Sequence, residues 1–305
     1  MALYKISMKA NLGFHVSIAG GISKSVSNAR DLGCNAFQIF TRNPRGWSAN
    51  PLRDKDVQDF KRELARNNNS LKIANDSIFV HMPYLPNLSS PNKSIYRKSL
   101  NVLSQEVDRC SKLSIPYLVL HLGSHQGKGS QNGINLIVNA CSSVLHKGNK
   151  SAKSKSEVTL LLENSAGQRH NVGSNFEEIR AILDKLKSLG NKKHVGVCLD
   201  TCHAFAAGYD LRTEKSVDET LDVFNKTIGI KENLKLVHLN DSKDNLNSGR
   251  DRHEHIGLGK IGMEGFKAFF KRKPIIDNVP LIMETPIDER RDNADNLNAV
   301  LKMVR

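Results

Sequence analysis

The chain has 305 residues, of which 39% are hydrophobic and 25% charged, enough to bury the core of one large domain or two ordinary ones. No apolar run approaches the roughly 18 residues that a membrane span needs, so we expect no membrane association. The 45 Lys and Arg residues exceed the 31 Asp and Glu residues and give a formal net charge of +14, a field that attracts polyanions such as nucleic acids.

Residues 1–17, MALYKISMKANLGFHVS, lack the apolar core and cleavage site of a signal peptide. We therefore expect a cytoplasmic protein, associated with the nucleoid if the source is prokaryotic. The five cysteines form neither an even framework nor a C-x-x-C pair, which favours reduced, buried thiols. Cys198 and Cys202 flank Asp200, and we interpret them as core residues because Cys198 lies within an apolar run. Nothing indicates an extended apolar interface, so we expect a monomer.

Eight short apolar runs follow one another along the chain, each with the composition of a buried strand. They cover residues 11–17, 34–41, 77–83, 117–123, 158–164, 195–200, 234–240 and 280–286. The polar residues at their ends are His15, Thr41, His81, His121, Glu163, Asp200, His238 and Glu284. Successive end residues are 26 (His15 to Thr41) to 46 (His238 to Glu284) positions apart, which leaves room for one helix and two loops each time.

The intervening segments have the apolar period of amphipathic helices. The stripes after the first, third and fourth strands are Ile22, Val26 and Ala29; Leu100, Leu103, Val107 and Cys110; and Ile134, Val138, Cys141 and Leu145. Gly33 is predicted to be a C-cap of the first helix. Two S-x-x-E capping boxes, Ser174 to Glu177 and Ser216 to Glu219, predict the starts of two further helices.

Eight alternating strands and helices predict an α/β protein, a single-domain (β/α)8 TIM barrel over residues 1–305. Within it, residues 146–157 (HKGNKSAKSKSE) are predicted to be a flexible basic insertion before the fifth strand, on the barrel face opposite the site. A doubly wound open sheet is the alternative, but SIAGG after the first strand does not have the spacing of a dinucleotide-binding glycine motif.

In a TIM barrel the carboxyl ends of the strands meet on one face, where function lies. Six strands end in a histidine or an acid that would meet there, namely His81, His121, Glu163, Asp200, His238 and Glu284. Crowded carboxylates repel one another and neutral imidazoles cannot compensate them, so bound cations best explain the set. Asp251 and His253 follow the seventh strand, and His203 could complete a separate site with them.

Nitrogen and oxygen ligands without thiolates point to zinc, manganese or iron, and the many histidines favour zinc. Nine candidate ligands are too many for one ion and suit two or three ions that share a bridging carboxylate. Clustered metals activate water and hold the attacking and leaving oxygens of a phosphoryl displacement. We interpret His15, His125 and His255 as structural residues near this ring, and His146, His170 and His194 as surface or loop residues.

Several strings resemble the endonuclease IV family of abasic-site repair enzymes: VHMPYLPNL, HLGSHQGKG, LLENSAGQ, CLDTCHAFAAGYDL, HLNDSK, RDRHEHIGLG and METP. The resemblance runs in order from HVSIAGG at residues 15–21 to METP at residues 283–286, nearly the whole chain. It implies a zinc-dependent TIM barrel that cuts DNA on the 5′ side of abasic sites and also trims blocked 3′ ends.

The resemblance also implies three zinc ions, with manganese or iron possible in some sites. One ion would be bound by His81, His121 and Glu163; a second by Glu163, as the bridging and catalytic residue, with Asp200, His238 and Glu284; and a third by His203, Asp251 and His253. A zinc-activated hydroxide would attack the phosphorus of duplex DNA and leave a 3′-hydroxyl and a 5′-deoxyribose phosphate.

For DNA binding, the resemblance implies that Arg45, Tyr84 and Leu85 wedge into the duplex. Such insertion costs a few kcal/mol of unstacking, least where a base is already missing, and so selects damage without reading sequence. The chain departs from the family at Gly46, where a longer polar residue is common, which leaves in question how this position fills the base stack.

Two other functions stay open from the residues themselves. A metal-dependent sugar isomerase shares the barrel and a ring of acids and histidines, but it typically uses fewer metals and a catalytic lysine or base. A non-catalytic nucleic-acid-binding barrel has no need of nine metal-ligand candidates.

Overall fold

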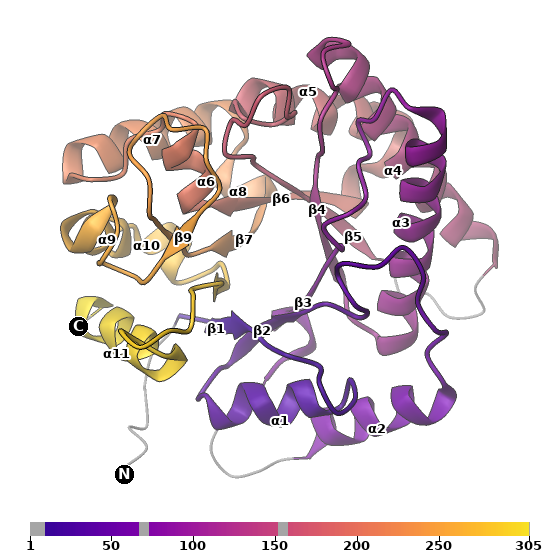
Figure 1. Ribbon diagram of the computed structural model, residues 1–305, viewed down its shortest axis with the longest axis horizontal. Helices are drawn as coiled ribbons and strands as arrows, with labels where there is room; N and C mark the ends of the chain where they lie inside the picture. Colours follow the sequence, from indigo (N-terminus) through magenta and orange to yellow (C-terminus); the bar gives the residue numbers. More distant parts are fainter. Residues whose placement is uncertain (1–9, 67–72, 152–157, 305) are drawn as a thin grey trace.

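The computed structural model describes residues 10–66, 73–151 and 158–304. Within these residues, eight parallel strands close into a barrel in the order β1-β10-β7-β6-β5-β4-β3-β2 (Figure 1). The barrel strands are β1 (Leu12–His15), β2 (Ala36–Ile39), β3 (Ile78–His81), β4 (Tyr117–His121), β5 (Thr159–Glu163), β6 (Val195–Asp200), β7 (Leu234–His238) and β10 (Leu281–Met283). The predicted TIM barrel is confirmed, and each strand falls within its predicted run.

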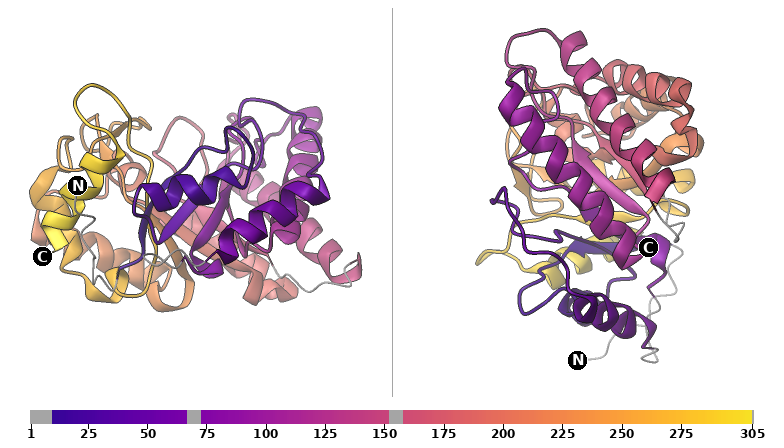
Figure 2. Two further views of the ribbon diagram at one scale, coloured as in Figure 1. Left: turned by 90° about the horizontal axis from the view of Figure 1, so that it is seen from below. Right: turned by 90° about the vertical axis from the view of Figure 1, so that its right-hand side faces the viewer.

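Helices surround the strands in every view (Figures 1 and 2). They are α1 (Lys24–Asp31), α2 (Asp54–Ala65), α3 (Lys93–Leu113), α4 (Ser130–Ser151), α5 (Phe176–Leu186), α6 (Thr201–Ala206), α7 (Glu214–Thr227), α8 (Ile230–Asn233), α9 (Gly262–Phe270), α10 (Lys273–Ile276) and α11 (Asn293–Val304). No helix in the described ranges is long and apolar enough to cross a membrane.

The inside of the barrel is a separate apolar layer beneath the carboxyl ends of the strands. It consists of Ala36, Phe79, Val119, Leu161, Cys198, Leu236 and Ile282. Because successive side chains alternate between the two faces of a strand, the residue two positions further along points inward as well. Those residues are Gln38, His81, His121, Glu163, Asp200, His238 and Glu284. Because inward-facing side chains recur at every second residue, a ring of polar side chains lies directly above the apolar layer.

Two predicted helix starts differ from the structure. Helix α5 is capped by Asn175, whose side chain accepts from the Glu178 backbone N–H, so the cap lies one residue after Ser174. The N-cap of α7 is Thr213, three residues before the predicted cap Ser216, and Thr213 forms a reciprocal capping box with Ser216. Thr213 and Ser216 both carry a hydroxyl that can cap a helix. The local sequence does not decide between them, and the path of the backbone does.

The predicted flexible insertion at residues 146–157 differs in part. Helix α4 extends to Ser151, so the first six residues of that segment continue the helix. Residues 152–157 lie outside the described residues. As predicted, Gly33 follows the end of α1 with a φ of 77°, a left-handed conformation that glycine adopts without strain.

Candidate metal centre

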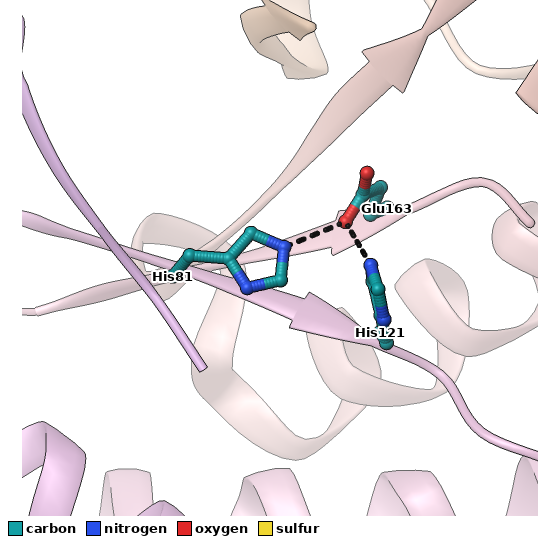
Figure 3. Close-up of side chains that lie close together, drawn as sticks. All are labelled: His81, His121 and Glu163. Carbon is teal, nitrogen blue, oxygen red and sulfur yellow. Dashed lines mark hydrogen bonds and ion pairs between the residues drawn. The ribbon is translucent and has the colours of Figure 1, made fainter. Parts of the chain in front are cut away.

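Glu163 lies at the centre of the polar ring and is almost wholly buried. One of its oxygens, Oε2, lies 3.2 Å from His81 Nε2 and 3.2 Å from His121 Nε2. Figure 3 shows the two imidazoles pointing at this carboxylate from the neighbouring strands β3 and β4. His81 Nδ1 lies 2.7 Å from the Met82 carbonyl, which can only accept, so the His81 proton sits on Nδ1 and its Nε2 lone pair faces Glu163.

The charges of this group depend on burial and on one another. The pKa of His81 is lowered from its usual value, and burial is the largest cause. Burial also opposes the negative charge of Glu163, but without a metal ion the nearby His121 and His238 imidazoles, in their protonated forms, hold the pKa of this carboxyl well below its usual range. Glu163 therefore stays ionised although it is excluded from water, as a metal ligand must be.

On the other side of Glu163, three carboxylates converge on one imidazole nitrogen. His238 Nδ1 lies 2.9 Å from Glu163 Oε1, 3.8 Å from Asp200 Oδ2 and 3.7 Å from Glu284 Oε2. The Asn240 amide holds two of these acids, because its Nδ2 donates to Asp200 Oδ2 at 2.7 Å and its Oδ1 accepts from the Glu284 backbone N–H at 2.8 Å. Such crowding is costly without a cation at its centre.

A third group lies between the first turn of α6 and the hairpin of β8 (Asp241–Ser242) and β9 (His253–Glu254). Asp251 Oδ1 lies 3.0 Å from His203 Nε2 and 3.3 Å from His253 Nε2. His203 Nδ1 lies 2.9 Å from the Asn164 backbone carbonyl, and His253 Nδ1 lies 3.2 Å from the Glu284 backbone carbonyl. Both Nε2 atoms are buried, and although Asp251 Oδ1 is close to each, neither is aligned for a hydrogen bond to any described residue.

The spacing and the chemical type of these side-chain atoms fit the binding of metal ions. The ligand atoms of His81, His121 and Glu163 lie within 4.8 Å of one another, as do those of His203, Asp251 and His253. The donors are nitrogen and oxygen atoms, which suit zinc and other first-row metals. In the third group, both buried Nε2 atoms lie near Asp251 Oδ1, and the carbonyl contacts of the Nδ1 atoms leave the Nε2 atoms free to bind a metal ion, as in known histidine-metal sites.

The hairpin that carries Asp251 and His253 is held by a buried acid, Asp241. Its carboxylate accepts backbone N–H bonds from Gly257 at 2.9 Å, Gly259 at 2.9 Å and Ile261 at 3.0 Å. Gly259 is required here, because an added Cβ would clash with the Ser242 carbonyl oxygen and with an Asp241 oxygen. The glycines of HIGLG thus serve to fold the loop tightly under the third group.

The three predicted DNA-binding residues lie at the rim of the centre. Tyr84 and Leu85 are 56% and 39% exposed, which is unusual for side chains of this size. The Tyr84 backbone N–H donates to the Pro44 carbonyl at 3.2 Å and so joins the loop of Tyr84 to that of the exposed Arg45. Tyr84, Leu85, Glu163 and Asp251 all line one pocket of about 240 Å³. Gly46 adds no side chain to this rim.

A buried network fixes the loop that carries Arg45. Arg109 on α3 bonds to both ends of this loop, through the Thr41 hydroxyl at 2.7 Å and the Asn50 carbonyl at 2.9 Å. Glu106 accepts from Thr41 Oγ1 at 2.6 Å and from Arg42 Nε at 2.5 Å. Arg42 and Glu106 are both buried, so their charges compensate each other away from water.

The prediction that Thr41 ends the second strand is wrong. Strand β2 ends at Ile39, and the ring position belongs to Gln38, which pairs with His15 across β1 and β2. The available signal was the lone polar residue inside the apolar run AFQIF. Asn164 and Asn240, which bond to Asp200, were also missed because an amide carries no charge pattern to detect.

Two of the remaining histidines differ in their surroundings, since His15 lies beside the ring and His255 belongs to a buried hydrogen-bond network. His15 Nδ1 is 3.2 Å from Glu284 Oε1, at the edge of the ring. His255 is fully buried and contacts Asp288 at 3.0 Å and Asn296 at 3.0 Å, so it is structural. Cys198 and Cys202 are buried as predicted. Burial raises the pKa of Cys198 to about 12, which keeps it a thiol, although it lies within ligand distance of Glu163 and His238.

Comparisons with known proteins agree with this geometry. A family model described as a xylose isomerase-like TIM barrel matches residues 26–305. The probable endonuclease 4 of Nitrosopumilus maritimus is 48% identical over 289 residues, which cover 94% of this chain and 97% of that protein. The crystal structure of endonuclease IV from Thermus thermophilus matches with a TM-score of 0.79 at 32% identity, covering 96% of this chain and 98% of that one.

Sugar-converting enzymes share the architecture at lower identity. A D-tagatose 3-epimerase-like protein matches with a TM-score of 0.67 at 18% identity over 96% of this chain and 98% of that one, which shows the fold alone. The relatives at higher identity span nearly their full length. With its closed barrel and its ring of acids and histidines, the chain belongs to the endonuclease IV family of xylose isomerase-like TIM barrels.

Proposed function

We propose that the protein hydrolyses the DNA phosphodiester bond on the 5′ side of abasic sites and leaves 3′-hydroxyl and 5′-deoxyribose phosphate ends. The observation that carries this proposal is the convergence of Glu163, Asp200 and Glu284 on His238 Nδ1 at the open end of the barrel. A site that presents several buried carboxylates repels a phosphodiester unless cations reverse its charge. The same cations are what phosphoryl transfer requires.

The nine predicted ligands would hold three zinc ions in the groups described above. When bound, metal ions in such a cluster lower the pKa of water and neutralise charge on the phosphate oxygens. Glu163 would bridge two of them, a role supported by its two oxygens, of which Oε2 faces His81 and His121 while Oε1 faces His238. Glu163 is therefore the residue on which we expect catalysis to depend most.

The rim would supply selectivity for damage. Tyr84 and Leu85 stand exposed beside the pocket, and Arg45 lies on the adjoining loop. Planar and apolar side chains can enter a base stack at low cost where a base is already missing. The formal charge of +14 favours approach to the DNA backbone whatever its sequence. The same site would trim blocked 3′ ends, since the bond to be hydrolysed is again a phosphate ester.

Incision of a defined duplex tests the proposal. The substrate is an end-labelled oligonucleotide duplex with one tetrahydrofuran abasic analogue, and the matched control is the same duplex with an intact base. We expect a single cut at the analogue whose upstream product carries a 3′-hydroxyl that a polymerase extends. A ketohexose, incubated in parallel and analysed for aldose and epimer products, tests the sugar-isomerase alternative. Sugar conversion without DNA incision would overturn the proposal.

A further inference from the structure

Gln38 is a fully buried residue of β2 whose side chain contacts the Nε2 edge of the His238 imidazole, whereas Glu163 contacts the Nδ1 edge. Its Oε1 lies 2.9 Å from His238 Nε2. Its Nε2 lies 2.7 Å from Glu284 Oε1 and 3.0 Å from His15 Nδ1. One uncharged carboxamide thus contacts two of the residues that would share a metal ion.

The chemistry of these partners leaves one consistent assignment of protons. An ionised Glu284 can only accept, so the amide nitrogen of Gln38 must face it. The amide oxygen of Gln38 then faces His238 Nε2, and an oxygen can only accept a hydrogen bond. His238 must therefore carry a proton on Nε2. Its lone pair in the neutral ring is on Nδ1, the atom that faces the three carboxylates.

We propose that Gln38 is a positioning residue that sets the tautomer of His238 and orients Glu284, so that both present lone pairs to the same metal ion. The inference rests on the proposed metal site and adds a residue to it. A histidine ligand commonly donates its other ring N–H to a carboxylate, a carbonyl or water, and this partner fixes the ring. The Gln38 amide oxygen is such a partner for His238, and the amide nitrogen donates to the second ligand, Glu284.

A carboxamide suits this position better than the alternatives. A glutamate would still accept from His238 Nε2, but its second oxygen would face Glu284 at about the same short distance and repel it. A methionine has a similar length and offers neither bond. The two replacements therefore separate the two roles of Gln38, since Gln38→Glu retains the contact to His238 and Gln38→Met removes both contacts.

Zinc binding is the first measurement, made on full-length protein without DNA. Wild type, Gln38→Met and Gln38→Glu are loaded with zinc and dialysed against a chromophoric zinc chelator, and the bound metal is then counted. Gln131→Met, on the exposed face of α4, is the matched control. We expect both Gln38 variants to lose about one equivalent of zinc under conditions that spare the wild type, with affinity roughly 10- to 100-fold weaker at that site.

The tautomer of His238 is the second measurement, from ¹⁵N chemical shifts of zinc-loaded protein with labelled histidine, assigned with His238→Gln. We expect a protonated Nε2 in wild type and in Gln38→Glu, and loss of this fixed signature in Gln38→Met. Circular dichroism and thermal melting monitor folding. If Gln38→Met does not fold, Gln38→Glu still tests the inference through its zinc content.

The outcomes separate this inference from the proposed function. Wild-type protein that binds no zinc and does not cut abasic DNA would overturn both. Wild type that binds zinc while folded Gln38 variants bind it within twofold of wild type would overturn the role of Gln38 alone. A proton on Nδ1 of His238 in the zinc-loaded wild type would also overturn it.

Discussion

The two ends of the barrel contrast in size and in chemistry. The pocket at the amino end, lined by residues such as Asp76, Tyr117, Lys231 and Lys235, has a volume of about 530 Å³. The pocket at the carboxyl end, which contains Glu163, has about 240 Å³. The larger pocket has one acid and no histidine among its lining residues, whereas the smaller one includes four of the nine predicted ligands, His121, Glu163, His203 and Asp251.

The difference shows that volume does not locate the chemistry of this fold. Backbone direction does, because the strands are parallel and all carboxyl ends open on the same face. Side chains that end the strands there are buried by their neighbours yet face a common centre. If backbone direction decides function, substitutions at the carboxyl end should change incision and substitutions at the amino end should not.

Glu163→Gln should have the largest effect. The amide keeps the size of the side chain but removes the charge that faces His81, His121 and His238. We expect incision of the abasic duplex to fall by more than the roughly 100-fold that loss of a residue positioning a ligand causes. Asp76→Asn makes the same change at the amino end and should leave the rate unchanged. Equal effects from the two variants would contradict the contrast.

Removal of metal should affect folding as well as activity. We expect exhaustive chelation to abolish incision, because the acids around His238 lose their compensating charge. A ligand at 100 times its Kd stabilises by ~2.7 kcal/mol, and each kcal/mol shifts Tm by about 2–4 °C in a chain of 150–250 residues. A fall in Tm on the order of 5–10 °C, reversed by added zinc, is the expected calorimetric result. An unchanged Tm and full activity after verified metal loss would argue against the centre.

Arg109→Gln should destabilise the carboxyl end through the loop that carries Arg45. The substitution removes bonds to Thr41 and Asn50 and leaves Glu106 with fewer partners. We expect a loss of about 3 kcal/mol in the free energy of unfolding, measured in urea. Lys112→Gln on the same helix removes the exposed pair with Asp108 and should cost below ~1 kcal/mol. Similar losses from both variants would contradict the role of the buried network in stabilising this loop.

Tyr84→Ala should weaken binding to abasic DNA and leave the metal content unchanged. Stacking of an aromatic side chain on bases contributes about 1–3 kcal/mol, which predicts roughly a 10- to 100-fold rise in Kd. Leu189→Ala, a similarly exposed apolar position just after α5, is the control and should not change Kd. Fluorescence anisotropy with abasic and intact duplexes measures both. Equal loss on both duplexes would mean that Tyr84 does not recognise damage.

The smallest effect is expected from the basic segment before β5. Replacement of Lys147, Lys150, Lys153 and Lys155 by glutamine should leave incision nearly unchanged, because a segment that precedes a barrel strand is predicted from the sequence to lie on the face opposite the site. The rate of incision at moderate salt is the measurement. A large decrease in the rate would indicate that DNA also contacts this basic segment, which would contradict the contrast between the two ends.

The sequence alone was sufficient for the strands, the fold and nearly all of the ring. Apolar runs and their polar ends are local features, and a parallel barrel brings equivalent positions together without further information. The ligand candidates His81, Glu163 and Asp200 were found in this way, and the structure places His81 and Asp200 near Glu163. Helix starts were less certain, because Thr213 and Ser216 both have the side chain of an N-cap.

Tertiary structure alone decided the place of Gln38, the network of Glu106 and Arg109, and the direction of each imidazole. An uncharged amide in an apolar run becomes a ring member only through the register of β2 against β1. The bonds of Glu106 to Arg42 and Thr41 span about 65 positions, and no local pattern encodes such a pairing. Hydrogen-bond direction depends on which atoms meet, and residues distant in sequence meet only once the barrel has closed.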